Sequence, residues 1–293
     1  YGVIHERQLK YFHEDFRLEG CDKLIKTKNF KPKNKVQSIR HTINPSLSYS
    51  NNPSFEKFYD TYIIDANGNT AEFYSLNPEE IKHVQGISAE ANDGRSLMMM
   101  AVGRSLKEAI DSAKYAKQNK ADLIMIHQPM DPFVDPHNQA NYILEIAESS
   151  EIPVVPYVRS TIIPKKDILR IAEHKNVVGV KFASADLKLL AQCINETSTS
   201  EIVWICGLAE SWTIPFYSLG ARGITSGLVN DIPEISLKQH SALEEKNYEK
   251  ALKLVSKISG FEGMRTKYNN GANVTVVKES LKLQGMNVGN VRL

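Results

Sequence analysis

From about residue 95 onward, short apolar runs alternate with amphipathic stretches, and this alternation constrains the fold more than any other feature of the sequence. The apolar runs are rich in β-branched residues and have the length of buried strands, whereas the stretches between them repeat with helical period. A repeat of roughly 20 to 30 residues is typical of parallel strands joined by crossover helices. The predicted strands span residues 97–102, 122–127, 153–157, 177–182, 202–206 and 223–226. The predicted helices span residues 105–119, 138–149, 165–174, 186–196 and 209–219.

An earlier unit of the same kind consists of a strand at 62–66 and a helix at 78–84, which brings the predicted strands to seven. An eighth strand would close a (β/α)₈ TIM barrel, a fold of about 250 residues. The alternative is an open, doubly wound sheet. We favour the barrel because the units are similar in length and no Gly-x-Gly-x-x-Gly turn follows a strand. The periodic segments at 241–258 and 274–283 predict a C-terminal helical extension.

The N-terminal region does not follow this pattern. Residues 22–40 carry seven basic side chains and one acidic one, and residues 41–55 are rich in Ser, Asn and Pro, with period-two alternation at Leu47 and Tyr49. No clean, buried first strand is visible there. We therefore expect three parts: an atypical basic and polar segment (1–60), the barrel (61–232) and a C-terminal helical region (233–293).

Composition excludes several classes of function. The 36 Lys and Arg are nearly balanced by 34 Asp and Glu, which gives no indication of a nucleic-acid partner. The three cysteines, Cys21, Cys193 and Cys206, are too far apart for a disulfide framework or a zinc site. No apolar run is long enough to span a membrane, and the first twenty residues hold no secretory signal. These features predict a cytoplasmic protein without a membrane partner.

Chemically useful side chains stand where the predicted strands end. Lys181 closes the apolar run 177–182, and Tyr157 and Arg159 follow the preceding strand. A lysine that is buried at a strand end loses part of its preference for the charged form and can attack a ketone to form a Schiff base. Arginine can bind a carboxylate through two hydrogen bonds, and a tyrosine can transfer protons. We interpret His127, at another strand end, as a pocket-lining or core histidine because no second ligand stands at metal-binding spacing.

At these residues the chain resembles the dihydrodipicolinate synthase / N-acetylneuraminate lyase family of class I, Schiff-base lyases. It is most similar to the branch that includes 5-dehydro-4-deoxyglucarate dehydratases. The run GNTAEFYSLNPEE at 68–80 resembles that branch's Gly-Asn-Thr-Gly-Glu-Phe loop and the helix that follows it. YVR at 157–159, VGVK at 178–181 and GITSGLVN at 223–230 resemble further family motifs in the same order. The likeness extends over residues 63–293.

The resemblance implies a role for each matching residue. Lys181 would form the imine with an α-keto acid, and Tyr157 would act as the general acid and base. Thr70 would bind the keto-acid carboxylate, and Arg159 would bind a distal carboxylate or hydroxyl. The remaining substrate-binding positions would be Asn69, Ser226 and Gly227. The implied protein is a homo-oligomer, tetramer or dimer, that needs no cofactor and no metal because the lysine imine supplies the electron sink.

Three of the departures from the family pattern bear on the fold and the reaction. Ala71 replaces a loop glycine and would be strained if its φ were positive. The run His127-Gln128-Pro129 is not followed by the tyrosine pair of dihydrodipicolinate synthases, which speaks against the reaction of those enzymes. The family's first strand, with its Thr-Pro-Phe turn, is not recognisable.

The leading hypothesis is a lyase that acts on a small acidic α-keto acid, such as a keto sugar acid, as a dehydratase or an aldolase. One alternative is a catalytically impaired barrel that serves as a binding or regulatory protein. Another is a condensing enzyme of the dihydrodipicolinate synthase type. A further possibility is that residues 1–60 are a foreign segment fused to the barrel.

Overall fold

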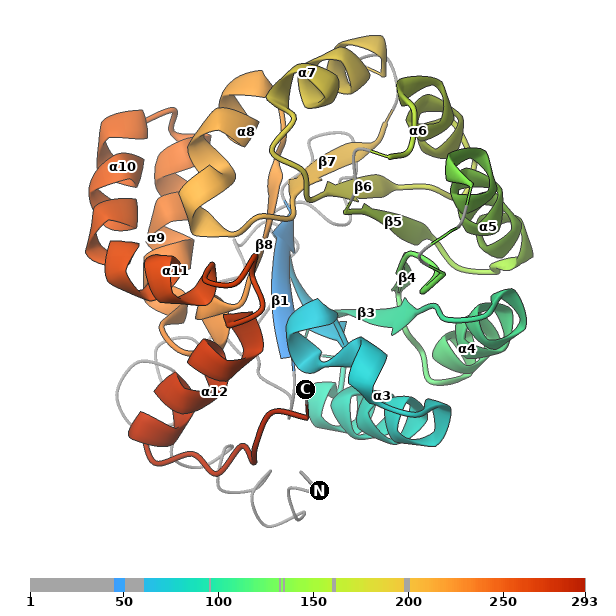
Figure 1. Ribbon diagram of the computed structural model, residues 1–293, viewed down its shortest axis with the longest axis horizontal. Helices are drawn as coiled ribbons and strands as arrows, with labels where there is room; N and C mark the ends of the chain where they lie inside the picture. Colours follow the sequence, from blue (N-terminus) through green and yellow to red (C-terminus); the bar gives the residue numbers. More distant parts are fainter. Residues whose placement is uncertain are drawn as a thin grey trace.

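Seven parallel strands form the centre of the structure, with helices around them (Figure 1). The computed structural model describes residues 45–50, 61–94, 96–131, 133, 135–159, 162–197 and 201–292, so the basic run at 22–40 lies outside the described residues. Each strand begins and ends within two residues of its predicted bounds. The strands are β2 (Thr61–Ala66), β3 (Leu97–Val102), β4 (Leu123–Ile126), β5 (Val154–Val158), β6 (Gly179–Phe182), β7 (Val203–Cys206) and β8 (Gly223–Ser226).

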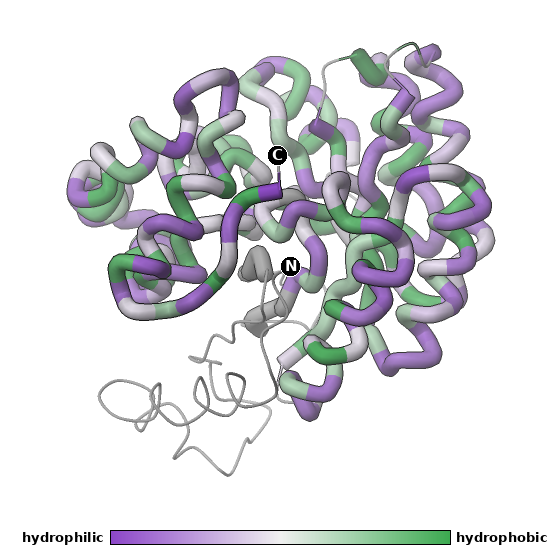
Figure 2. Tube along the Cα trace, turned by 60° about the horizontal axis from the view of Figure 1, so that its bottom comes forward, coloured by the Kyte–Doolittle hydropathy of each residue, from purple (hydrophilic) through white to green (hydrophobic). Residues whose placement is uncertain are grey.

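A helix follows each of the first six parallel strands, as expected of βα units. In Figure 2 these helices carry hydrophilic and hydrophobic residues in alternation, because one side of each helix packs on the barrel. Helix α3 is longer than predicted and begins with a capping box formed by Asn77 and Glu80. The helices are α3 (Pro78–Asn92), α4 (Leu106–Gln118), α5 (Pro136–Ser149), α6 (Lys165–Ala172), α7 (Leu187–Glu196) and α8 (Thr213–Leu219).

The eighth position of the closed barrel is taken by β1 (Pro45–Ser50), which is antiparallel to both of its neighbours. Leu47 pairs with Ile64 of β2, and Tyr49 pairs with Ile224 of β8. The expectation that residues 1–60 hold no recognisable first strand is thereby corrected. Parallel strands read as continuous apolar runs, whereas the alternating sequence PSLSYS is typical of an antiparallel strand. The division of the chain at residues 60 and 232 stays a prediction.

Beyond the barrel, the chain continues in α9 (Pro233–Glu244), α10 (Tyr248–Lys257), α11 (Ser259–Arg265) and α12 (Asn273–Leu283). The periodic segment predicted at 241–258 is helical, but it is divided between α9 and α10. Lys246 has a left-handed φ of 56°, which ends the first helix. The side chain of Asn247 then accepts a hydrogen bond from the backbone N–H of Lys250 and starts α10.

The alternation of side chains along the strands separates two apolar layers. Val180 and Phe182 belong to the larger core, between the strands and the outer helices, so Lys181 between them points toward the barrel axis. Met99, Met125 and other inward-facing residues form a second core that fills the barrel below the lysine. In the part of the chain that is described, no helix has the length and apolar character needed to cross a membrane.

Candidate active site

A cavity of about 560 Å³ opens at the C-terminal ends of the strands, where (β/α)₈ barrels carry their active sites. Six of the seven residues predicted from the sequence line it: Thr70, Tyr157, Arg159, Lys181, Ser226 and Gly227. The seventh, Asn69, begins a short 3₁₀ turn, and its side chain lies outside the described part of the structure. Residues far apart in the sequence therefore line one cavity at the C-terminal end of the barrel.

Lys181 lies at the floor of the cavity with only 4% of its surface exposed. Its Nζ atom is 4.3 Å from the centroid of the Tyr157 ring and 3.6 Å from Met125 Sδ. The Asp65 carboxylate lies 3.9 Å from the same Nζ atom. Burial lowers the pKa of Lys181 below its ordinary value of 10.5, and the charge of Asp65 opposes part of this shift. A larger fraction of the lysine is therefore the neutral, nucleophilic amine.

Tyr157 pairs directly with Lys181 across β5 and β6. The tyrosine is 5% exposed, and burial together with the charge of Asp65 raises the pKa of its phenol, against an opposing effect of Arg159. The phenol therefore keeps its proton at neutral pH and can donate it to an oxygen above Lys181. Arg159 itself is exposed on the cavity wall, where its guanidinium can meet the outer end of a ligand.

His127 packs against this pair. Its ring stacks on Phe73 with centroids 4.2 Å apart and meets Tyr157 edge-on at 5.5 Å. Burial, followed by the charge of Lys181, lowers the pKa of His127 to about 3. The histidine is therefore a neutral core residue, consistent with the interpretation made from the sequence. No cluster of three or more His, Cys, Asp or Glu with the arrangement of metal ligands occurs among the described residues, and cofactor-free chemistry stays a prediction.

The loop after β2 carries Thr70 and adopts an unusual backbone conformation at Glu72, whose φ is 59°. The positive φ therefore occurs at Glu72 and not at Ala71, where the sequence had suggested it. Glu72 is held in place by an ion pair with Lys278 of α12. Its other carboxylate oxygen accepts a hydrogen bond from the backbone N–H of Arg292. The C-terminal part of the chain thus fixes this loop beside the cavity.

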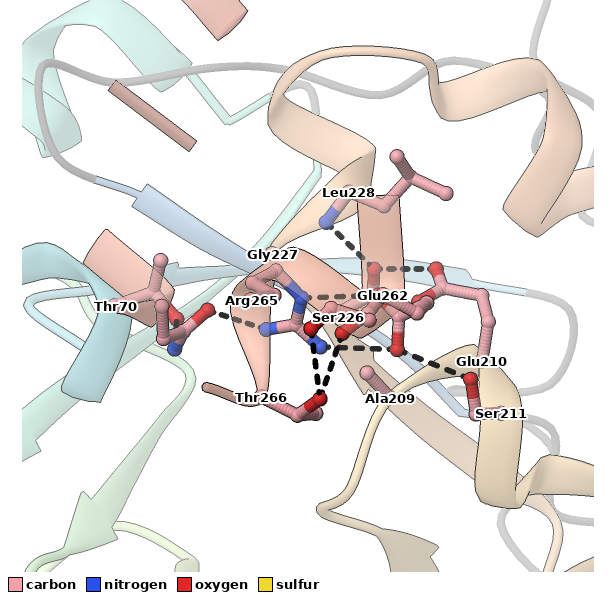
Figure 3. A network of polar contacts seen from close by, with 12 residues as sticks. Thr70, Ala209, Glu210, Ser211, Ser226, Gly227, Leu228, Glu262, Arg265 and Thr266 are labelled. Carbon is pink, nitrogen blue, oxygen red and sulfur yellow. Dashed lines mark hydrogen bonds and ion pairs between the residues drawn. The ribbon is translucent and has the colours of Figure 1, made fainter. Parts of the chain in front are cut away.

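Ser226 lines the cavity, but its hydroxyl is engaged within the protein. It donates to Glu210 and accepts from the backbone N–H of Leu228 at 3.0 Å (Figure 3). Glu210 is fully buried and also accepts a hydrogen bond from Ser236. Burial and the neighbouring Glu262 raise the pKa of Glu210. Ser226 therefore contributes to the wall of the cavity with a hydroxyl that is already hydrogen-bonded within the protein.

Sequence reasoning missed three residues that the structure brings to the site: Asp65, Arg265 and Asn273. Asp65 left a signal, because a carboxylate within the apolar strand TYIIDA is unusual and alternation with the outward-facing Ala66 directs it inward. Arg265 and Asn273 left no such signal in the sequence. They come from α11 and α12, and only the folded arrangement places those helices over the end of β8.

Known proteins resemble this chain in sequence and in fold. The model of the dihydrodipicolinate synthetase family matches residues 60–293. A probable 5-dehydro-4-deoxyglucarate dehydratase of Streptomyces coelicolor is 26% identical over 231 residues, which cover 76% of this chain and 73% of that protein. A 4-hydroxy-tetrahydrodipicolinate synthase of Methanoculleus marisnigri is 28% identical over 233 residues, which cover 77% of this chain and 78% of the relative.

Solved structures resemble the barrel and its extension. The crystal structure of dihydrodipicolinate synthase from Oceanobacillus iheyensis has a TM-score of 0.75 and 36% sequence identity, covering 78% of this chain and 76% of that chain. N-acetylneuraminate lyase from Mycoplasma synoviae shares the fold, with a TM-score of 0.67 at 23% identity and coverage of 78% and 77%. These matches confirm the resemblance that the sequence motifs indicated: the chain belongs to the dihydrodipicolinate synthetase family of class I lyases.

Proposed function

We propose that this protein is a lyase that acts on a small acidic α-keto acid, of the keto sugar acid type, through a Schiff base on Lys181. The observation that carries the proposal is the position of the buried amine directly beside the Tyr157 phenol, at the floor of an open cavity. The amine is shifted toward its neutral form and the phenol retains its proton. Imine formation needs the neutral amine as the nucleophile, and a proton donor beside it accelerates the loss of water.

In the proposed reaction, the Lys181 amine attacks the keto carbon and forms a carbinolamine. Tyr157 protonates the hydroxyl that leaves as water, and the imine remains. Loss of a proton from the neighbouring carbon then gives the enamine, which expels a hydroxyl from the next carbon in a dehydration. In an aldol cleavage the imine instead loses the proton of the hydroxyl on the next carbon, the bond between these two carbons breaks, an aldehyde leaves, and the enamine of the shorter keto acid remains to be protonated. Water finally releases the product and restores the amine.

The cavity also has features that suit an acidic substrate. Thr70 lies on one wall, where its hydroxyl and the backbone of its loop are proposed to bind the carboxylate next to the keto group, with Asn69 and Gly227 completing this corner. Arg159 is proposed to bind the distal carboxylate or a hydroxyl. The names of relatives such as the Streptomyces coelicolor protein favour 5-dehydro-4-deoxyglucarate as the substrate and dehydration as the reaction. We extend the proposal to a homo-oligomeric enzyme, a tetramer or a dimer.

A second candidate function is a condensation of the dihydrodipicolinate synthase type, favoured by the 36% identity to the Oceanobacillus iheyensis structure. The two functions are distinguished by incubating the protein with 5-dehydro-4-deoxyglucarate and, separately, with pyruvate and an aldehyde partner. We expect loss of water from the sugar acid and no condensation product. Condensation without dehydration would favour the second candidate. If neither substrate reacts and borohydride traps no adduct, the protein is a catalytically impaired barrel.

A further inference from the structure

Arg265 of α11 lies at the end of β8, beside the carboxylate corner of the cavity (Figure 3). A Cβ atom added to Gly227 would lie 3.4 Å from Arg265 Nη1 and 3.5 Å from Thr70 Cγ2. The guanidinium and the Thr70 side chain therefore approach each other over a residue that has no side chain. Arg265 is 8% exposed, so its hydrogen bonds are made with little competition from water.

Glu262 fixes the orientation of this arginine. Its Oε1 atom accepts from Arg265 Nε at 2.9 Å, and its Oε2 atom accepts from Nη2 at 3.3 Å. Ser211 donates a further hydrogen bond to the same carboxylate. The planar guanidinium is thus held on one side, and its Nη1 atom is directed at the side chain of Asn273. A lysine could not make this set of contacts, because it lacks the rigid fork of donors.

The direction of the hydrogen bonds follows from the chemistry of arginine. A guanidinium has only donors, so the atom of Asn273 that faces Arg265 must be the amide oxygen. The Nδ2 atom of Asn273 is then turned toward Thr70 and donates to Thr70 Oγ1 at 3.3 Å. Because the threonine oxygen accepts this hydrogen bond, the single proton of its hydroxyl is left to donate elsewhere.

We propose that Arg265 and Asn273 are positioning residues that turn the Thr70 hydroxyl into a donor aimed at the carboxylate of the bound keto acid. Thr70 and Asn273 both line the cavity, so the hydroxyl and its orienting partner meet the same ligand space. The inference rests on the proposed function, because it assigns the carboxylate of an imine-forming substrate to this corner. It gives the C-terminal helices a part in recognising the substrate.

The test compares two ligands that differ only in the carboxylate. Pyruvate carries the carboxylate next to its keto group, whereas methyl pyruvate carries a neutral ester. For each variant, borohydride trapping is measured against the concentration of each ligand, and the ratio of the two half-saturating concentrations is recorded. A general loss of structure affects both ligands, so the ratio isolates recognition of the carboxylate.

Asn273→Asp is close to isosteric and replaces the donor by an acceptor, so the Thr70 hydroxyl would donate to the new carboxylate rather than to the ligand. We expect the half-saturating concentration of pyruvate to rise by about tenfold or more relative to that of methyl pyruvate. This is the size expected for the loss of one hydrogen bond to a charged group. Asn247→Asp makes the same change at the cap of α10, outside the cavity lining, and should leave the ratio unchanged.

A double-mutant cycle tests whether Asn273 acts through Thr70. Thr70→Val should raise the ratio, Asn273→Ala should raise it less, and the double variant should match Thr70→Val alone. The inference would be overturned if the effects of the two single variants added in full. It would also be overturned if Asn273→Asp and Asn273→Ala left the ratio unchanged while trapping persisted. Either result would leave the imine mechanism intact. Equal weakening of both ligands would also overturn the inference. Absence of any adduct in the wild type would overturn the proposed function and this inference together.

Discussion

Lys181 and Tyr157 stand opposite each other in the register of β5 and β6, with the lysine Nζ 4.3 Å from the centre of the tyrosine ring. Burial is the largest cause of both pKa shifts, lowering that of the amine and raising that of the phenol. Both groups are therefore driven toward their neutral forms. One location in the barrel thus holds the two groups that the proposed reaction needs, an amine to attack the keto carbon and a phenol to protonate the hydroxyl that leaves.

The first prediction concerns the pH dependence of imine formation. Only the neutral amine attacks a ketone, so the trapping rate should rise with pH and reach half its maximum below 10.5, the ordinary lysine pKa. The charge of Asp65 favours the ammonium form, so Asp65→Asn should move this midpoint to still lower pH. Asp111→Asn, an exposed change on α4, serves as the control. An upward movement of the midpoint in Asp65→Asn would contradict the electrostatic assignment.

The second prediction concerns Tyr157→Phe. This variant keeps the ring that packs against the amine and removes only the proton donor, so the protein should fold and bind pyruvate normally. Loss of a general acid lowers rates by about 10²- to 10⁴-fold, and we expect a fall of this size in the rate of imine formation, measured by rapid quenching with borohydride. Tyr142→Phe, which loses a hydrogen bond to the Arg104 carbonyl outside the cavity lining, is the matched control. Equal rates in the two variants would exclude Tyr157 as the acid.

The third prediction concerns the buried carboxyl of Glu210. Its pKa is raised in the folded protein, so its contribution to stability is complete below the unfolded value of 4.5 and is lost as the pH rises through the folded pKa. The free energy of unfolding of the wild type should fall over this range, and Glu210→Gln should remove the fall. Urea denaturation at a series of pH values measures the difference, with Glu90→Gln on the exposed side of α3 as the control. If the free energy of unfolding of Glu210→Gln depended on pH in the same way as that of the wild type, the assignment of a raised pKa to Glu210 would be refuted.

The fourth prediction concerns the ion pair between Lys278 and Glu72, in which both side chains are more than nine-tenths buried. Lys278→Met leaves a buried carboxylate without its cation and should cost about 3 to 5 kcal/mol in the free energy of unfolding. Lys253→Met breaks an exposed pair on α10 and should cost less than about 1 kcal/mol.

The double variant Glu72→Gln with Lys278→Met should recover most of the loss, because no buried charge remains. Chemical denaturation of the single and double variants measures this recovery. A double variant that is no more stable than Lys278→Met would show that the desolvated charge is not the source of the cost.

The sequence predicted the parallel strands well because each is a continuous apolar run, and the bounds of β3 and β8 match the prediction to the residue. Lys181 could be identified because it is a lone lysine at the end of an apolar run whose sequence resembles a family motif. The strand β1 was not identified because its alternating pattern was compared with that of a parallel strand. Arg265 and Asn273 could not be found, because their role depends on how α11 and α12 pack across the end of β8.

Lys181 is proposed to form a covalent imine with a keto acid. Borohydride reduction of the protein in the presence of pyruvate, followed by peptide mass spectrometry, detects this imine. We expect a reduced pyruvate adduct on the peptide that contains Lys181, and no adduct in Lys181→Ala. A protein that gains no mass with pyruvate, 5-dehydro-4-deoxyglucarate or related sugar acids, or an adduct located on another lysine, would contradict this proposal.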